Sequence, residues 1–266
     1  MAKKKVNLRA IQPRKSTEVE YRKALMAISK SMSDFVKKEI IPLLKQEQSQ
    51  YVADDLSDDL SEKLDEFKRR YFNIETLATG ISTRFVNQVN QSNKQRFDAE
   101  TMERLGVNVF ADNQKLSLIL KSKIEENTNL IVSQPQEYFK SISNSVFEGV
   151  TQGLRASEIE KNIRKATRSL DKRIKLIARD QVNKANAALN EERQKELGVT
   201  EYRWSNSGDR RVRGKSNPGG LYPNSKYDHW AREGKIYSWD DPPPDGHPGQ
   251  PYGCRCVAQP VIEIET

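Results

Sequence analysis

The 266-residue sequence is poor in cysteine and histidine, with two of each. Cys254 and Cys256 are separated by one residue, which is too close for an unstrained disulfide, and two cysteines are too few for a disulfide-dependent secreted fold. We therefore expect a reducing compartment. The sequence also lacks an apolar run that could span a bilayer, and no apolar signal core follows the lysines at 3–5, so we expect a cytoplasmic protein with no membrane partner.

The common catalytic motifs are missing as well. The sequence contains no Walker loop, no GxSxG elbow, no HExxH and no pair of carboxylates at catalytic spacing. The standard signals for phosphate hydrolysis and nucleophilic catalysis are thus absent, and we expect a protein that is not an enzyme. Only 35% of the residues are hydrophobic while 31% are charged, which suits helices with much solvated surface or packing against a large assembly.

Positive charge is in excess, with a formal net charge of +8. This excess favours a polyanionic partner, because neutralised phosphates release counterions, although composition does not separate DNA from an acidic protein surface. The charge is uneven, since residues 54–66 are rich in acids whereas residues 1–15 contain no acid and hold Lys3, Lys4, Lys5, Arg9, Arg14 and Lys15. We expect residues 1–15 to form an extended basic arm.

Apolar periodicity predicts helices through most of the first half. The predicted tracts are 16–48, where Pro42 should kink or interrupt the end, and then 54–73, 76–104, 113–126 and 136–151. Leu56, Leu60, Leu64 and Phe67 form the clearest amphipathic stripe. Turn-forming residues from Gly106 to Asn113 and from Asn127 to Gln136 should separate the later helices.

The second half begins with helix and then changes period. Glycines near 153 predict a break, the spacing of Ser157 and Glu160 predicts a capping box, Ser169 could cap another helix, and Gly198 should end it. Short strands are then expected at 202–204 and 236–239, with an edge segment at 257–264. We predict an α+β protein with a basic arm (1–15), a helical docking region (16–152) and a C-terminal helix with a small β-rich module (153–266).

The order of residues in this second half resembles the phage Mu F-like minor head protein family, also called head morphogenesis proteins. The resemblance covers residues 150–260, and it is specific because of the ordered set, which isolated motifs would not be. The residues that carry it are Ile177, Ala178, Arg179, Asn186, Gly198, Trp204, Asp209, Arg211, Val212, Arg213, His229, the run GKIYSW at 234–239, the prolines at 242–244, His247-Pro248 and Cys254-Arg255-Cys256.

The resemblance implies a minor capsid protein of a tailed bacteriophage, present in a few copies in the virion. It implies contact with the portal protein or the major capsid protein, and a role in head morphogenesis and in DNA packaging or ejection. Two departures stand out. Asp180 and Gln181 replace a Thr-Glu pair found in many relatives, which weakens any catalytic role there, and residues 214–228 look like an insertion.

The cysteines and histidines all lie within the last 38 residues. Thiolate and imidazole are preferred zinc ligands, and a small β-rich module with little aliphatic core would gain folding free energy from a structural zinc. The predicted ligands are Cys254, Cys256 and His229, with His247 or Asp209 as the fourth. The alternative is that the cysteines are small buried groups, that His229 bonds a carboxylate, and that Arg255 pairs with an acid.

The densest basic segment after the N-terminus is a candidate for contact with double-stranded DNA. Its members are Arg203, Arg210, Arg211, Arg213 and Lys215, to which Lys3, Lys4 and Lys5 of the arm are added. The alternative is a turn that Asp209 and one arginine lock internally, with the remaining charges solvated. Residues 155–184 carry ten Lys and Arg against four Asp and Glu, a pattern usual for the solvated face of an amphipathic helix, although it would also contact DNA without sequence preference.

Three classes of function follow from these patterns. The leading one is a structural virion protein, with helices docked on the portal or capsid and the C-terminal module facing DNA. The second is a metal-dependent nuclease using Asp209, the arginines, His229 and His247, with a histidine as general base. The third is a DNA-binding accessory protein that is not incorporated into particles. Trp204, Trp230 and Trp239 are assigned to packing because aromatic residues usually fill the core of a small β module.

Overall fold

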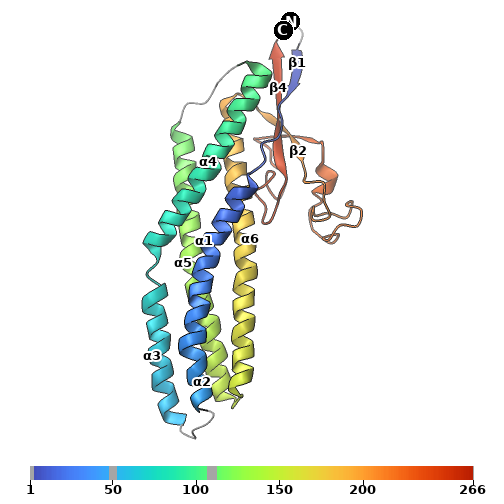
Figure 1. The fold of residues 1–266 in the computed structure, drawn as a ribbon. Helices are drawn as coiled ribbons and strands as arrows, with labels where there is room; N and C mark the ends of the chain where they lie inside the picture. The colour runs from blue at the N-terminus through green and yellow to red at the C-terminus, as the bar shows by residue number, and fades with distance from the viewer. Residues whose placement is uncertain (1–2, 48–52, 107–112, 266) are drawn as a thin grey trace. The chain divides into compact units, whose positions relative to one another are not determined.

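The computed structural model describes residues 3–47, 53–106 and 113–265. It has a helical part and one small antiparallel sheet, which confirms the predicted α+β class (Figure 1). The contacts divide the chain into a helical unit, formed by Val19–Arg84 and Ile124–Ala178, and a sheet unit, formed by Met1–Glu18, Phe85–Lys123 and Arg179–Thr266. None of the described helices is long and apolar enough to cross a membrane.

The helical unit takes its core from amphipathic stripes on several helices. Helix α1 (Lys15–Phe35) and helix α3 (Ala53–Tyr71) meet through Phe35 and Phe67, whose ring centroids lie 5.7 Å apart at 73°. The stripe predicted on α3 is confirmed where side chains are described, since Leu60, Leu64 and Phe67 are buried; Leu56 lies outside those residues. Tyr21 of α1 donates a buried hydrogen bond of 2.8 Å to Asn127.

The interruption predicted at Pro42 is confirmed. Residues Val36–Ile40 form a π-helical turn (η1) and helix α2 (Ile41–Glu47) begins directly after it. Because proline has no N–H and its ring crowds the preceding turn, the α-helical hydrogen bonding of α1 cannot continue unchanged through this point. Val36 and Ile40 remain buried, so the turn still contributes to the core.

The turn predicted between 127 and 136 is wrong. Helix α4 (Glu75–Leu105) matches its prediction, but helix α5 runs without a break over Gln114–Thr151 and contains Pro135. Proline within a helix costs about 3 kcal/mol because one backbone hydrogen bond is lost. Burial on both sides of the proline offsets this cost, and the buried residues of α5 continue along one face as Asn127, Ile131, Gln134, Tyr138, Ile142 and Val146.

Helix α6 (Ala156–Glu196) is continuous, so the second helix start predicted at Ser169 is also wrong. The capping box predicted from Ser157 and Glu160 is wrong, because Ser157 lies inside the helix. Instead, the Glu158 carboxylate accepts the Arg155 backbone N–H at 3.1 Å, which is one of the two hydrogen bonds of a capping box. The end of the helix is as predicted. Gly198 has φ of 71°, and the Val199 N–H donates to the Gln194 carbonyl at 2.9 Å, as in a glycine-terminated Schellman motif.

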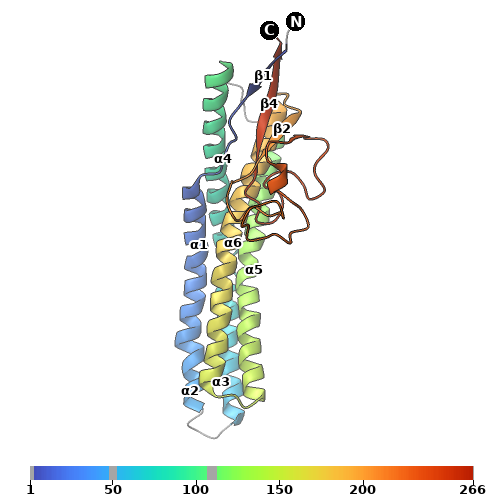
Figure 2. The same ribbon diagram turned by 90° about the vertical axis from the view of Figure 1, so that its right-hand side faces the viewer.

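The sheet has the strand order β1-β4-β2-β3, with antiparallel neighbours throughout. Strands β2 (Glu201–Ser205) and β3 (Ile236–Ser238) lie where the sequence predicts them. Strand β4 (Val257–Glu265) is not an edge strand as expected, because β1 (Lys3–Asn7) pairs with it from Lys3↔Glu265 to Asn7↔Val261. Both views show β1 running beside β4 (Figures 1 and 2).

The segment after β1 is fixed by buried contacts. Leu8 and Ile11 are buried, and the Ile11 carbonyl accepts the side-chain amides of Asn186 at 2.8 Å and Asn190 at 3.0 Å. Asn93 of α4 donates to the amide oxygens of the same two asparagines. Residues predicted to form a basic arm are therefore extended and integrated into the sheet unit. The side chains of Lys3, Lys4 and Lys5 lie outside the described residues.

Candidate metal centre

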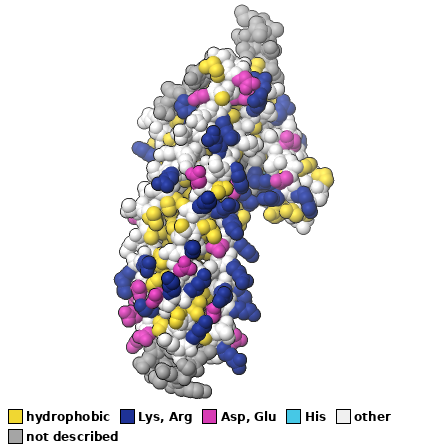
Figure 3. Space-filling model, in the orientation of Figure 1, with side chains coloured by type: hydrophobic (Ala, Val, Ile, Leu, Met, Phe, Trp, Pro, Cys, Tyr) yellow, Lys and Arg dark blue, Asp and Glu magenta, His cyan; other side chains and the backbone are white. Residues whose placement is uncertain are grey.

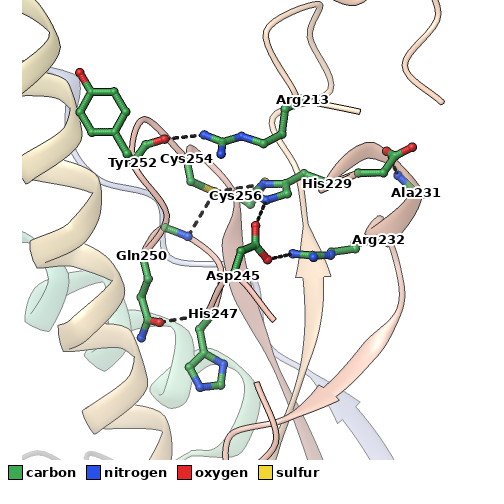
Figure 4. A network of polar contacts seen from close by, with 12 residues as sticks. Arg213, His229, Ala231, Arg232, Asp245, His247, Gln250, Tyr252, Cys254 and Cys256 are labelled. Carbon is green, nitrogen blue, oxygen red and sulfur yellow. Dashed lines mark hydrogen bonds and ion pairs between the residues drawn. The ribbon is translucent and has the colours of Figure 1, made fainter. Parts of the chain in front are cut away.

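His229, Cys254 and Cys256 form a buried cluster in the sheet unit. Their candidate ligand atoms all lie within 4.8 Å of one another, and the three residues are 1%, 3% and 4% exposed. The Nδ1 atom of His229 lies 3.5 Å from the Cys254 sulfur and 3.7 Å from the Cys256 sulfur. Figure 4 shows both sulfur-bearing side chains directed toward the imidazole ring. The structure therefore brings together three of the five residues predicted as metal ligands.

The backbone around the cluster is held by α6 and by the loops of the module. His229 precedes the 3₁₀ turn η2 (Trp230–Arg232), and its N–H donates to the Arg213 carbonyl at 2.9 Å. The Gly253 N–H donates to the buried Asp180 carboxylate of α6 at 2.6 Å, directly before Cys254. Asp180, noted as a departure from the family pattern, thus anchors the cysteine-bearing loop.

Gly249 makes a close approach that a larger residue would prevent. Its N–H lies 3.4 Å from the Cys254 sulfur, and its φ is +87°. A Cβ at this position would lie 2.8 Å from the Cβ of Ala187 on α6, which is too close for carbon atoms. The glycine therefore lets the loop approach α6 while its N–H faces the sulfur.

A carboxylate orients the imidazole ring. The Nε2 atom of His229 lies 2.7 Å from Asp245 Oδ2, and the other oxygen of Asp245 accepts Arg232 Nη1 at 2.7 Å. Burial raises the pKa of Asp245, but the hydrogen bonds from His229 and Arg232 outweigh it and hold that pKa below its ordinary value. Since an ionised carboxylate accepts the Nε2 proton, Nδ1 presents its lone pair to the two sulfur atoms.

The two thiols differ in their tendency to ionise. A hydrogen bond with Cys256 lowers the pKa of Cys254 well below its ordinary value, and the Gly249 N–H acts in the same direction against the effect of burial. Cys256 donates in this pair and is buried, so its pKa is raised. Of the two thiols, Cys254 is therefore the one that loses its proton more readily.

The spacing of the donor atoms fits a tetrahedral metal. Zinc binds sulfur at about 2.3 Å and imidazole nitrogen at about 2.0–2.1 Å, which separates a sulfur from a nitrogen ligand by roughly 3.6 Å in a tetrahedron. The two sulfur–nitrogen distances, 3.5 and 3.7 Å, lie on either side of this value. These three residues have the geometry and the chemistry to hold a thiophilic divalent cation.

The two residues predicted as alternative fourth ligands, His247 and Asp209, bond other residues. His247 Nδ1 lies 2.9 Å from the Tyr202 hydroxyl, and Figure 4 shows its ring pointing away from the sulfur atoms. Asp209 forms a bidentate ion pair with Arg255, which holds the pKa of Asp209 at about 2. The group of candidate ligands in the described chain includes neither residue. The contacts expected if the cluster holds no metal are present too. His229 bonds the Asp245 carboxylate, and Arg255 pairs with Asp209.

The residues of the nuclease hypothesis do not converge on one centre. Asp209 is bound to Arg255, His247 to Tyr202 and His229 to Asp245, so each candidate catalytic group already has a separate partner. The buried position of His229 also separates its ring from bulk solvent. The arrangement therefore favours a structural role for His229 and not the role of a general base.

The basic segment 209–213 forms a turn. The Asp209 carboxylate accepts the Arg211 N–H at 2.9 Å and its carbonyl accepts the Val212 N–H at 3.0 Å, which closes the chain locally. Three arginines of the wider basic segment donate to backbone carbonyl groups: Arg203 to Gly234, Arg210 to Gly219 and Arg213 to Tyr252. Arg211 and Lys215 are exposed.

The tryptophans assigned to packing include two that are buried. Trp204 and Trp239 share a core with Tyr202, Cys254, Cys256 and Ala258, and Trp204 stands edge-on to His229 with ring centroids 5.1 Å apart. Arg232 lies over the Trp204 ring, with its guanidinium carbon 4.8 Å from the centroid. The core of the sheet unit and the candidate metal centre are therefore continuous.

Sequence reasoning missed the residues that position the ligands. Asp245 and Arg232 are ordinary charged residues in a proline-rich loop and a short turn, and no spacing connects either one with His229. A histidine ligand usually has a carboxylate partner, which is the one signal that could have pointed to Asp245. The sequence contains 37 Asp and Glu residues, so this signal does not single out Asp245. Their roles depend on the tertiary path of the loops.

Comparison with known proteins finds a family match that includes the candidate metal centre. Residues 140–259 match the family model described as Phage Mu protein F like protein. We call this matched stretch the Mu F-like region. The resemblance seen in the sequence is thereby confirmed over these residues.

One relative extends the similarity beyond the Mu F-like region. An uncharacterized protein of Haemophilus influenzae strain Rd is 28% identical over 262 residues, which are 94% of this chain and 54% of the relative. The chain thus spans about half the length of that relative. No solved structure matches the chain significantly.

Proposed function

We propose that this protein is a minor capsid protein of a tailed bacteriophage, bound near the portal and in non-specific contact with the packaged double-stranded DNA. The Mu F-like match over residues 140–259 is the observation that carries the proposal. The proposed partners are the portal protein, the major capsid protein and DNA, and the proposed location is the virion, after assembly in the host cytoplasm. In this proposal the protein has a structural role in head morphogenesis and in DNA packaging or ejection, and it catalyses no reaction.

A basic stripe on α6 supports the DNA contact. Five exposed residues recur at alternating spacings of four and three and form no ion pair within the described part of the chain: Lys161, Lys165, Arg168, Lys172 and Lys175. Each of four buried residues lies two positions before or after a member of this stripe: Ile159, Ile163, Leu170 and Ile174. Two positions correspond to about half a helical turn, so these apolar side chains face the opposite side of the helix. Figure 3 shows Lys and Arg side chains gathered along the edge where α6 runs.

The length of this basic stripe suits a nucleic-acid backbone. Fourteen residues separate its first and last members, which corresponds to roughly 21 Å at 1.5 Å per residue, and B-DNA presents several phosphates over that length. Contacts of this kind are independent of base sequence because phosphates carry no sequence information. Arg211 and Lys215 of the exposed loop are the further candidates for phosphate contact, whereas Arg203, Arg210 and Arg213 also hold the module together.

Protein analysis of intact particles tests the virion assignment. Mass spectrometry of purified virions and of isolated portal complexes should detect this chain in both, in a few copies per particle. Its absence from virions and from assembling heads would remove the proposal. Salt-dependent DNA binding without incorporation into particles would instead support the accessory-protein hypothesis.

Salt-dependent binding of random-sequence duplex DNA tests the contact surface. Replacing the five residues of the basic stripe with Gln should lower the slope of log K against log salt by about 0.9 for each phosphate that is no longer neutralised, up to about 4.5. A matched control replaces five exposed cations elsewhere in the helical unit: Lys23, Lys30, Lys38, Arg69 and Lys140. An equal change of slope in both variants would mean that net charge alone drives binding, and would refute the stripe as the contact surface.

A further inference from the structure

We infer that His229, Cys254 and Cys256 are ligands of one structural zinc ion. The inference is independent of the proposed function, because it rests on the donor atoms and their surroundings. Two sulfurs and one imidazole nitrogen face one another within 4.8 Å, and both sulfur–nitrogen separations match the edge of a zinc tetrahedron.

The surroundings of His229 are those of a metal ligand. In zinc proteins the ligating imidazole usually donates its other N–H to a carboxylate, which fixes the ring and strengthens the metal bond. His229 has this arrangement, since Asp245 accepts from Nε2 and leaves Nδ1 facing the sulfurs. The carboxylate is itself held by Arg232, so that the three side chains form one connected array.

The location of the cluster explains what the metal would stabilise. Cys254 and Cys256 directly precede β4, while His229 follows the exposed loop 214–228 that carries few apolar groups to the core. The core of this part of the sheet unit is small and consists mainly of aromatic rings and the two cysteines. A metal bond between these distant segments would supply stability that burial alone supplies poorly in a small module.

Metal analysis of the full chain tests the inference directly. Inductively coupled plasma mass spectrometry should find about one zinc per chain after purification without chelators. Cys254→Ser, Cys256→Ser and His229→Gln should each lose the metal. His247→Gln serves as the matched control, because His247 is a buried histidine of the same module that bonds Tyr202. This control should retain zinc, and a zinc-free His247→Gln protein would contradict the assigned ligand set.

Spectroscopy of the unmodified protein keeps the test valid if the ligand variants fail to fold. X-ray absorption at the zinc edge should show two sulfurs at about 2.3 Å and two nitrogen or oxygen ligands at about 2.0–2.1 Å. A first shell with no sulfur, or with more than two sulfurs, would overturn the assignment. Protein that folds fully, contains no zinc and takes up none from added zinc would refute the inference and favour a buried thiol–imidazole cluster.

Discussion

Asp245 connects the imidazole ring of His229 with the guanidinium group of Arg232 and contacts neither sulfur in this arrangement. At the residue scale it is therefore a positioning residue, which acts on a metal only through the ligand that it orients. Its side chain is 8% exposed and that of Arg232 is 11% exposed, so water competes weakly for these hydrogen bonds. Such outer partners strengthen metal binding without touching the metal.

We predict that Asp245→Asn lowers zinc affinity by about 10- to 100-fold, because an amide holds the imidazole tautomer less firmly than a carboxylate does. The measurement is competition with a chelator of known affinity. Asp241→Asn is the control, since Asp241 is exposed in the same proline-rich loop. An unchanged affinity in Asp245→Asn, with the metal still bound to the sulfurs, would show that the carboxylate does not orient the ligand.

The Asp209–Arg255 ion pair allows a prediction of pH dependence. Hydrogen bonds from Arg255 hold the pKa of Asp209 at about 2, below its ordinary value of 3.8. A depressed folded-state pKa contributes stability above the unfolded-state pKa, and this contribution is lost as the pH falls through about 2. The Asp209 side chain is 41% exposed, so water screens the pair and we expect only about 1 kcal/mol.

Asp209→Asn should therefore be less stable than the wild type by about 1 kcal/mol at pH 7, and the difference should shrink as the pH falls from about 4 toward about 2. Urea unfolding of both proteins across this range measures the effect. The substitution retains a side-chain oxygen for the Arg211 N–H, so the turn itself should survive. A difference that is constant with pH would show that the ion pair contributes no stability.

At the scale of elements, close packing of α5 against α6 limits one position sharply. A Cβ on Gly149 would lie 2.5 Å from Cγ1 and 2.8 Å from Cδ1 of Ile159, which is buried and β-branched. Helix propensity alone favours alanine over glycine by about 1 kcal/mol. The steric conflict outweighs this gain, because a β-branched side chain within a packed core has few alternative rotamers.

Gly149→Ala should destabilise the protein by about 1–3 kcal/mol. Gly80→Ala is its control, because Gly80 lies inside α4 with no atom within 4 Å of the added Cβ, and this change should be neutral or stabilising by up to about 1 kcal/mol. Thermal or urea unfolding of the two variants gives the comparison. Equal stability changes in both would mean that the contact with Ile159 relaxes without cost.

Several element boundaries followed from local signals, and others did not. Gly198 ends α6 because its positive φ suits a helix terminus, and this signal is contained in the sequence itself. Pro135 and Ser169 are equally typical of helix boundaries, yet both lie inside helices. Their local preferences, worth up to about 3 kcal/mol, are overridden by apolar stripes that continue past them into a buried core. Burial of that kind depends on neighbouring helices.

At the scale of the whole molecule, the sheet unit gathers segments that are far apart in the sequence. Strand β1 from the start of the chain covers β4 from its end, and the candidate metal ligands come from residues 229, 254 and 256. The helical unit has its own apolar core, including the Phe35–Phe67 contact. The proposed zinc should therefore stabilise the two units to different degrees.

Removal of zinc should loosen the sheet unit more than the helical unit. We predict that chelation raises amide hydrogen exchange in residues 229–258 by at least about tenfold, while the helices of Val19–Arg84 and Ile124–Ala178 keep their protection. Exchange mass spectrometry with and without chelator measures this, and added zinc should restore protection. Uniform loosening of both units would show that the effect is not local to the metal centre.

The sequence by itself determined the chemistry available to this protein. The α+β class, the amphipathic helices, the strands at 202–204 and 236–239 and the Mu F-like pattern all follow from local periodicity or from residue order. The identity of the three candidate ligands also follows, because the sequence has only two cysteines and two histidines to offer sulfur or imidazole ligands.

Only the tertiary structure decided how this chemistry is arranged. It paired β1 with β4, kept α5 continuous through Pro135, excluded Asp209 and His247 from the cluster and introduced Asp245 as the partner of His229. The physical reason is that each of these outcomes depends on contacts between residues distant in the sequence. Local propensity says nothing of such contacts, whereas burial and hydrogen bonding in the folded chain depend on them.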